Sequence, residues 1–265
     1  MPFSDTLVDR LARASRVAVL TGAGISKESG VPTFRDVDGL WQKFRPEELA
    51  NIEAFLRNPV LVQGWYTHRR KILDDIQPNP GHHALAELER MVEQRPGGHF
   101  LLVTQNVDNL HQEAGSSDVV ELHGNLKRTY CIDCERLASR EELDKLEEGA
   151  EARCPRCDGL IRPDVVWFGE LLPREAMERA AQAAAEADVF LSVGTSAVVY
   201  PAAGLPLIAA DSGAYTAEIN VEPSAIADVM AEVVIGPAGV VLPQLVEAVR
   251  AARAHDGEGR ARSGD

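Results

Sequence analysis

The sequence predicts an α/β fold, in which a doubly wound, Rossmann-like parallel sheet carries a smaller domain made of a helical insertion and a four-cysteine module. Three observations lead to this prediction. Short apolar runs alternate with helical patterns along most of the 265 residues, a glycine-rich turn follows the first apolar run, and the four cysteines form two closely spaced pairs. Strands that alternate with helices form a parallel sheet covered by helices on both faces.

The strands are expected at short runs of apolar and β-branched residues. The first run, 17–20, follows a helical pattern that begins with Ser4 or Asp5 as its cap. Further strands are expected at 100–104, 119–122, 189–193, 215–220 and 233–235. Helix-forming patterns lie between them at 84–93, 174–187 and 242–252.

Two segments interrupt this alternation and are assigned to the smaller domain. Residues 36–80 are mostly helical in pattern and contain several prolines, and residues 125–162 hold the cysteines. The tail 255–265, rich in Gly, Arg and Asp, is expected to be disordered. The Rossmann-like domain then comprises 1–35, 81–124 and 163–254.

One uncharged stretch, 189–210, is long enough to raise the alternative of a membrane span. Gly194, Pro201, Gly204 and Pro206 interrupt helical continuity within it, which favours a buried strand followed by a loop. The prediction is therefore a protein without a membrane-spanning segment.

The formal net charge of −14 argues against nucleic acid as a partner, because a phosphate-binding surface needs an excess of Lys and Arg. Basic or lysine-bearing proteins suit this charge better, although an acidic surface also simply keeps many proteins soluble. The first residues, MPFSDTLVDRLARAS, lack the apolar stretch of a secretory signal, which predicts a cytoplasmic location.

The cysteine spacing favours zinc over disulfides, since a reducing compartment keeps thiols free to bind metal. Cys131 and Cys134 form one C-x2-C pair and Cys154 and Cys157 another, with residues 135–153 between them. This is the spacing of a four-cysteine zinc site, in which each pair forms a turn that presents two thiolates. Four cysteines saturate tetrahedral zinc and leave no open position for water, so we expect a structural ion.

A glycine turn, Thr21-Gly22-Ala23-Gly24-Ile25-Ser26, follows the first expected strand. Its glycines would let the backbone approach a pyrophosphate closely, with N–H groups pointing at the anion. Lys27 stands where the usual dinucleotide-binding pattern has a third glycine, so a purely structural turn is the alternative.

The longer run GAGISKESGVPTFR predicts an irregular, mobile cover instead of an immediate helix, because Gly30, Pro32 and Gly39 interrupt helical continuity. On this cover, Phe34 could shield a ligand and Arg35 could donate to a phosphate or ribose. The alternative places Phe34 in the core and Arg35 on the surface.

Polar side chains stand at the ends of several expected strands, where a parallel sheet binds dinucleotides. Strand 100–104 runs into Gln105-Asn106-Val107-Asp108-Asn109, whose amide and acid groups can orient a carboxamide and a water. A mere helix cap would need only one of them. Gly194-Thr195-Ser196 ends a second strand, and Asn220, followed by Glu222, ends a third and could bond a ribose hydroxyl. Either of these two could instead be an ordinary turn.

His123 follows strand 119–122 and could face the same crevice. The titration range of histidine suits a general base. A lone histidine is as often an ordinary buried polar residue, so position alone leaves both interpretations open.

A series of motifs resembles the sirtuin family in order and spacing. They are GAGISKESGVPTFR, TQNVDNLH, ELHGN, the two cysteine pairs, RPDVVWFGE, GTSAVVYPA and the strand end Ile219-Asn220, and they span about residues 10–250. The resemblance implies a Rossmann-like large domain, a small domain of helical and zinc-binding parts, NAD as co-substrate and one structural Zn²⁺ ion.

The resemblance also implies roles for single residues. His123 would be the general base, with Asn106 as the second catalytic residue. The NAD site would draw on the glycine turn, the cover and the strand ends: Gly22, Ala23, Gly24, Ile25, Phe34, Arg35, Gln105, Asn106, Val107, Asp108, Gly194, Thr195, Ser196, Asn220, Val221, Glu222 and Ala238.

In the reaction that the resemblance implies, the carbonyl oxygen of an acyl-lysine attacks the nicotinamide ribose and expels nicotinamide. The histidine then deprotonates a ribose hydroxyl, which attacks the resulting imidate. The products are free lysine, nicotinamide and O-acyl-ADP-ribose, so the acyl group moves from lysine to ADP-ribose.

Two further matches concern the substrate. The segment Val165-Val166-Trp167-Phe168-Gly169-Glu170 resembles the strand that pairs with an extended substrate peptide, in which Val166, Trp167, Phe168, Gly169 and Glu170 would bind substrate. Tyr66 and Arg69 resemble the Tyr-x-x-Arg pair of the class III branch, which removes succinyl and malonyl groups. A guanidinium can hold a carboxylate by two hydrogen bonds and a tyrosine hydroxyl can add a third. The alternative is a surface arginine beside a half-buried tyrosine.

The leading hypothesis is an NAD-dependent protein-lysine deacylase, a desuccinylase and demalonylase with deacetylase activity, that acts as a monomer on acylated-lysine proteins. A protein mono-ADP-ribosyltransferase uses the same NAD cleavage with a protein side chain as acceptor, and is the enzymatic alternative. The non-enzymatic alternative is an NAD-sensing zinc protein, which the cluster 105–108 argues against because sensing needs no base.

Overall fold

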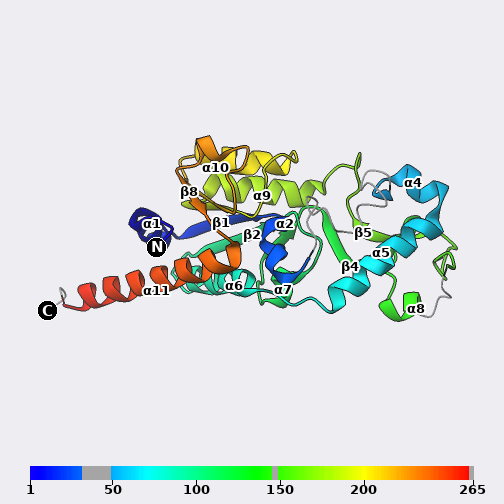
Figure 1. The fold of residues 1–265 in the computed structure, drawn as a ribbon, viewed down its shortest axis with the longest axis horizontal. Coiled ribbons are helices and arrows are strands. Elements are labelled where there is room, and N and C mark those ends of the chain that lie inside the picture. The colour runs from blue at the N-terminus through cyan, green and yellow to red at the C-terminus, as the bar shows by residue number, and fades with distance from the viewer. Residues whose placement is uncertain (32–48, 145–148, 263–265) are drawn as a thin grey trace.

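The computed structural model describes residues 1–31, 49–144 and 149–262 (Figure 1). Its main feature is a six-stranded sheet in the order β3-β2-β1-β6-β7-β8, in which neighbouring strands run parallel. The strands are β1 (Arg16–Thr21), β2 (His99–Thr104), β3 (Val119–Glu121), β6 (Val189–Val193), β7 (Tyr215–Asn220) and β8 (Glu232–Ile235). The strand order reverses between β1 and β6, which confirms the predicted doubly wound α/β fold.

Helices cover both faces of this sheet. On one face lie α1 (Asp5–Arg13), α6 (Pro80–Glu93) and α11 (Ala238–Arg262), and on the other lie α9 (Arg174–Glu186) and α10 (Leu205–Asp211). Side chains alternate along a strand, so Val17 and Val19 of β1 pack in the first layer, and Ala18 and Leu20 in the second. Figure 1 shows α6 and α11 below the sheet and α9 and α10 above it.

Local sequence signals set where the helices begin. The side-chain oxygen of Ser4 accepts a hydrogen bond from the Leu7 N–H at 3.1 Å, which caps α1 as predicted. Helix α6 begins at Pro80, earlier than the predicted residue 84, because Asn79 caps it and proline suits the first helical turn. The shorter elements are α7 (Leu110–Glu113) and the 3₁₀ turn η4 (Ala227–Val229).

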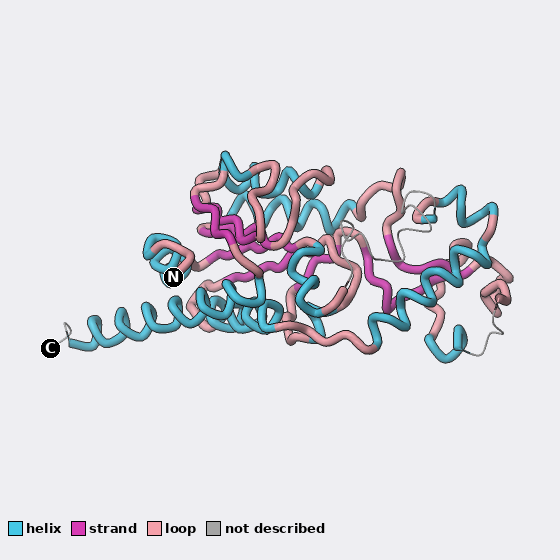
Figure 2. The backbone as a smooth tube through the Cα atoms, in the orientation of Figure 1, coloured by secondary structure: helices cyan, strands magenta, loops and turns pink. Residues whose placement is uncertain are grey.

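A smaller domain lies beyond one end of the sheet, on the right in Figures 1 and 2. It contains α4 (Ile52–Arg57), α5 (Pro59–Asp74), α8 (Arg140–Asp144) and the antiparallel strands β4 (Gly124–Cys131) and β5 (Ile161–Val165). Helices α4 and α5 and the strand pair share a core that includes Phe55, Trp65, Tyr66, Leu126 and Trp167. The helical insertion and the cysteine-bearing segment therefore pack against each other.

The sequence predicts an irregular cover after β1, and over its described part, 22–31, the structure differs from this prediction. The short helix α2 (Ala23–Ser26) and the 3₁₀ turn η1 (Lys27–Ser29) follow the strand almost at once. Gly22 follows the strand in an extended conformation and serves as the N-cap of α2, so the glycine marks a helix start. Phe34, Arg35 and Gly39 lie outside the described residues.

The segment after β6 also differs from the prediction of a strand followed by a loop. The chain forms the 3₁₀ turn η3 (Ala202–Gly204) and then α10. Pro206 lies in the first turn of α10, where its missing N–H is not needed, so it does not break the helix. Among the described residues, none of the helices is long and apolar enough to cross a membrane.

Helix α11 runs to Arg262, so the backbone is helical through most of the tail for which the sequence predicts disorder. Ala, Arg and Glu extend an existing helix at little cost, because its nucleus is already formed, and this outweighs Gly257 and Gly259 in the helical part of the tail. Residues 263–265 lie outside the described part of the chain.

Candidate active site and zinc module

The glycine turn packs directly against the end of β6. The Gly22 N–H donates to the Val193 carbonyl at 3.0 Å, and the Gly24 N–H donates to the Gly194 carbonyl at 2.8 Å. A Cβ on Gly24 would lie 2.7 Å from the Gly194 Cα, closer than real Cβ contacts allow. These two glycines are thus required by the approach of two strand ends, and their N–H groups are engaged by protein carbonyls.

Polar side chains around Ser26 form a connected network at the ends of β1 and β2. The Ser26 hydroxyl donates to the Asp108 carboxylate at 2.7 Å and accepts from the Asn106 amide at 3.1 Å. The same amide donates to the Gly22 carbonyl at 3.1 Å. Burial raises the pKa of Asp108, opposed by hydrogen bonds from Leu110 and Ser26. The structure therefore brings the predicted Asn106 and Asp108 together with the glycine turn.

His82 joins this network from the start of α6, a contact that sequence reasoning missed. Its Nδ1 accepts from the Asn79 N–H at 3.3 Å, so the ring proton is on Nε2 and points to the Ser26 hydroxyl, 3.3 Å away. Burial lowers the pKa of His82 to about 4, which keeps the ring neutral. The Asn79-Pro80 helix-start signal in the sequence could have located this residue at the N-terminus of a helix.

The other predicted strand ends meet at Thr195. The Gln105 amide donates to the Thr195 hydroxyl at 3.0 Å, and the Asn220 amide donates to the Thr195 carbonyl at 3.0 Å. Ser196 is half-buried beside them. The carboxyl ends of β2, β6 and β7 are therefore tied together at the reversal of strand order, where doubly wound sheets bind ligands.

The remaining residues predicted for the NAD site lie around this point. Ile25 is buried, whereas Ala23 and Val107 are half-buried. Val221 and Glu222 are exposed just past β7, and Ala238 begins α11. The N–H of Gly239 donates to the Glu28 carboxylate at 2.7 Å, so the start of α11 lies beside η1.

His123 lies in the turn between β3 and β4, where the large sheet gives way to the smaller domain. Its Nδ1 lies 2.9 Å from the Gln105 carbonyl, which can only accept, so Nδ1 carries the proton. The basic lone pair is therefore on Nε2. Burial lowers the pKa of His123, and the bond to Gln105 opposes this shift. A half-buried histidine held in one tautomer and neutral at neutral pH has the properties of a general base.

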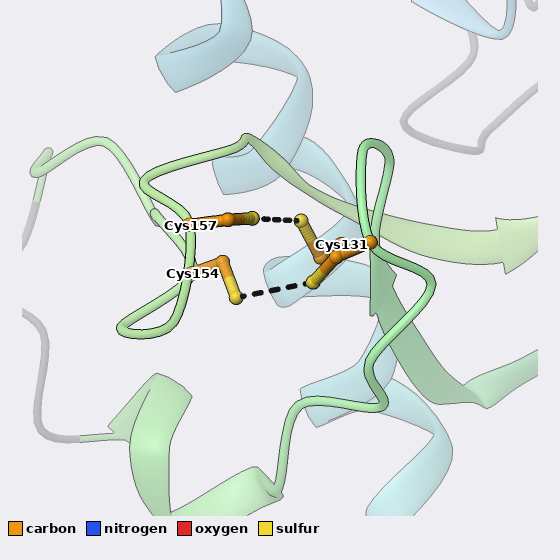
Figure 3. Close-up of side chains that lie close together, drawn as sticks. Cys131, Cys154 and Cys157 are labelled. Carbon is orange, nitrogen blue, oxygen red and sulfur yellow. Dashed lines mark hydrogen bonds between the residues drawn. The ribbon is translucent and has the colours of Figure 1, made fainter.

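The four cysteines predicted to bind zinc converge in the smaller domain (Figure 3). Their Sγ atoms all lie within 4.8 Å of one another, with Cys131 and Cys157 at 3.4 Å and Cys134 and Cys154 at 3.7 Å. Sulfurs around a tetrahedral zinc with Zn–S bonds of about 2.3 Å lie about 3.8 Å apart. The cluster fits one zinc ion whose coordination is completed by protein ligands.

The segment predicted to pair with a substrate peptide is not a strand over its whole length. Strand β5 ends at Val165, and Val166–Glu170 continue as a turn because the Glu170 N–H donates to the Trp167 carbonyl at 3.0 Å. The Val166 N–H donates to the His123 carbonyl at 2.9 Å, which fixes the turn beside the histidine. Phe168 is exposed, whereas Trp167 is buried.

Tyr66 and Arg69 share one side of α5, next to Trp167. The Tyr66 hydroxyl accepts from the Trp167 indole N–H at 2.8 Å, and burial raises the pKa of Tyr66 to about 12. The Arg69 guanidinium lies 6.0 Å from the centre of the Tyr66 ring and 4.9 Å from that of Trp65. Arg69 is half-buried, and burial lowers the pKa of its guanidinium.

Comparisons with known proteins agree with this geometry. Residues 22–201 match the Sir2 family. The chain is 52% identical over 244 residues to the NAD-dependent protein deacylase 2 of Pyrobaculum aerophilum, covering 92% of this chain and 95% of that protein. It resembles the crystal structure of a Sir2 homologue in complex with NAD, with a TM-score of 0.87, 43% identity and 95% of each chain covered. It also resembles a Sir2 protein bound to a myristoylated histone peptide, with a TM-score of 0.74, 37% identity, and 94% of this chain and 97% of that chain covered. The chain belongs to the Sir2 family.

Proposed function

We propose that this protein is an NAD-dependent protein-lysine deacylase that transfers the acyl group from lysine to ADP-ribose and releases nicotinamide. The observation that carries the proposal is His123, whose Nδ1 is fixed by the Gln105 carbonyl and whose Nε2 is basic. It stands beside the amide network at the reversal of strand order. The name of the Pyrobaculum relative and the structural neighbours with NAD and with an acylated peptide support the same activity.

The residues proposed to hold NAD fit a ligand with ribose hydroxyls and an amide. The ends of β1, β2, β6 and β7 present amide and hydroxyl groups that can both donate and accept. When bound, NAD supplies an electrophilic ribose carbon and nicotinamide as the leaving group. The Asn106 amide is placed to orient a carboxamide or water, and His123 Nε2 to take a proton from a ribose hydroxyl.

Zinc supports this chemistry from outside the site. The four cysteines would hold one ion that links the turn after β4 to the turn before β5. All of its ligand positions are filled by sulfur, so its contribution is the folded shape of the smaller domain.

We propose further that the enzyme prefers acidic acyl groups, succinyl and malonyl, over acetyl. Tyr66 and Arg69 support this because they place a buried hydroxyl and a half-buried cation in one small cluster. A carboxylate carries the charge opposite to that of the guanidinium and can accept hydrogen bonds from both side chains. A neutral acetyl group carries no such charge.

Matched peptides test both proposals. The protein is incubated with NAD and with one lysine peptide in acetylated, malonylated and succinylated form, and the freed peptide is measured by mass spectrometry. We expect all three to be deacylated, with the highest kcat/KM for the acidic groups. Failure to free any of them would refute deacylation, and removal of acetyl alone would refute the acyl preference.

A second arm follows the fate of the ADP-ribose. In a deacylase the label from NAD leaves in a small molecule, whereas stable transfer of labelled ADP-ribose to protein would support the mono-ADP-ribosyltransferase alternative. Acylated-lysine proteins are the partners that we propose. The monomeric state, the cytoplasmic location and the lack of nucleic-acid binding stay predictions from the sequence.

A further inference from the structure

Trp167 connects the turn beside His123 to Tyr66, one of the two residues proposed to recognise the acyl group. Its side chain is 2% exposed. The indole N–H donates to the Tyr66 hydroxyl at 2.8 Å, and the Arg162 guanidinium lies 3.6 Å from the ring centre. The preceding residue, Val166, is bonded to the His123 backbone. A single side chain therefore spans the distance from the catalytic turn to helix α5.

Arg162 and Glu170 hold the Trp167 ring in this position. The two Arg162 amino groups donate to the two Glu170 oxygens at 2.6 and 2.9 Å, and one of them also donates to the Val165 carbonyl at 2.9 Å. The Trp167 backbone N–H donates to the same carboxylate at 2.8 Å. Phe55 contacts the ring as well, with 5.1 Å between ring centres. The indole therefore has little freedom to turn its N–H away from Tyr66.

The direction of this hydrogen bond determines what the Tyr66 hydroxyl can do. An indole N–H can only donate, so the Tyr66 oxygen acts as the acceptor toward Trp167. The phenol proton must then point to a different acceptor. Tyr66 stays protonated because burial raises its pKa to about 12, so the proton is present throughout the neutral range.

We propose that Trp167 is a positioning residue for acyl-group specificity, which holds the Tyr66 hydroxyl so that its proton is directed to the acyl carboxylate beside Arg69. This inference rests on the proposed preference for acidic acyl groups. It assigns the selectivity to a chain of contacts that runs from Arg162 in β5 through Trp167, in the turn next to the general base, to Tyr66 in α5. A purely structural Trp167 would fill space in the small-domain core and would affect every acyl group alike.

Replacing Trp167 by Phe tests the inference, because it keeps an aromatic ring and removes the N–H. The measured quantity is the ratio of kcat/KM for the succinyl peptide to that for the acetyl peptide. We expect this ratio to fall about tenfold or more, the size expected for one hydrogen bond to a charged group. An unchanged ratio in a folded variant would overturn the inference. A closer isostere, β-(3-benzothienyl)alanine at position 167, replaces the N–H by sulfur and should give the same fall.

A double-mutant cycle separates positioning from packing. If Trp167 acts through Tyr66, the ratio in Trp167→Phe/Tyr66→Phe should equal that in Tyr66→Phe alone. If the two substitutions instead lower the ratio by independent factors that multiply in the double variant, the inference is contradicted. Phe55→Leu is the matched control, since it loosens packing against the same ring without touching the hydrogen bond, and it should lower stability with the ratio held within about twofold.

The two levels of the proposal fail in different ways. A wild-type protein that removes acetyl and not succinyl or malonyl would refute the acyl preference, and with it the role of Trp167. If the wild-type protein removes succinyl and the Trp167→Phe variant has the same succinyl-to-acetyl ratio, only the positioning role would be refuted.

Discussion

Three histidines lie in and around the amide network, and their hydrogen bonds separate their roles. His82 uses both ring nitrogens, one on the Asn79 N–H and one on the Ser26 hydroxyl. His111 is fully buried against Thr21. His123 uses Nδ1 on a backbone carbonyl, which leaves Nε2 as the basic atom. Burial lowers the pKa of all three, so each is neutral at neutral pH, and His123 has the geometry of the proton acceptor.

The lowered pKa of His123 predicts the acid side of the pH profile. A general base works only when deprotonated, so kcat/KM should be constant at neutral pH and fall as the pH drops through the pKa of His123. We expect the midpoint below the ordinary histidine value of about 6.5. Initial rates at low peptide concentration from about pH 5 to 9 would measure it. A midpoint above the ordinary histidine value would show that burial does not determine the pKa of His123.

Arg69 should determine the choice of acyl group. In Arg69→Met the long apolar side chain is kept and the cation is lost, so kcat/KM for the succinyl peptide should fall about 30-fold or more relative to the acetyl peptide. Arg70→Met is the matched control, because the Arg70 guanidinium donates to Thr67 on the same helix. Equal losses on the two peptides in Arg69→Met would contradict the proposed contact.

At the scale of elements, the glycine turn packs closely against the end of β6, so a change in one should disturb the other. Gly24→Ala would place a Cβ 2.7 Å from the Gly194 backbone. We expect it to lower the free energy of unfolding by about 1–3 kcal/mol, the usual cost of overpacking. Gly64→Ala, in the middle of α5 with nothing within 4 Å of the added Cβ, should instead stabilise by about 0.5–1 kcal/mol. Urea unfolding of both variants measures the difference, and equal effects would refute the requirement for close approach.

Elements with a strong local signal could be predicted from the sequence. Strands β6 and β7 lie where their apolar runs predict them, and the spacing of the cysteines predicted the cluster that the structure shows. Strand β4 was missed because it contains the exposed Lys127 and Arg128 and shifts register against β5, so it lacks a clear alternation of apolar residues. Its existence depends on β5, which is distant in sequence.

The sequence indicated which candidate residues lie together at strand ends, but not the contacts between them. Asn106, Asp108 and His123 were found because they follow strands, and doubly wound sheets place such residues together. His82 was missed because its contact with Ser26 joins residues that are 56 apart in the sequence. The bond between Trp167 and Tyr66 joins residues that are 101 apart, and no local pattern indicates it.

On the scale of the whole molecule, the site lies where the large sheet meets the smaller domain. The sheet contributes the amide network, and the smaller domain contributes the turn after β5 and helix α5 (Figure 1). His123 belongs to both, since it follows β3 and its carbonyl is bonded to Val166. The shape of the smaller domain should therefore affect catalysis even though the zinc site is not catalytic.

Removal of zinc tests this dependence. We expect one zinc ion per chain, and treatment with a strong chelator should unfold the segment that carries the cysteines and abolish most of the deacylation. Circular dichroism should still report the helices and sheet of the large domain. A Cys131→Ser/Cys134→Ser variant should behave like the chelated protein. A zinc-free protein with full activity would contradict a structural role.

The most direct test of deacylation through His123 is a product balance. For each lysine freed, the wild-type protein should consume one NAD and one water and release one nicotinamide and one O-acyl-ADP-ribose. His123→Asn should still bind NAD but should form the O-acyl product at least about 100-fold more slowly, as loss of a general base predicts. Lysine freed without NAD, or an equal rate of product formation in His123→Asn, would contradict the proposed reaction.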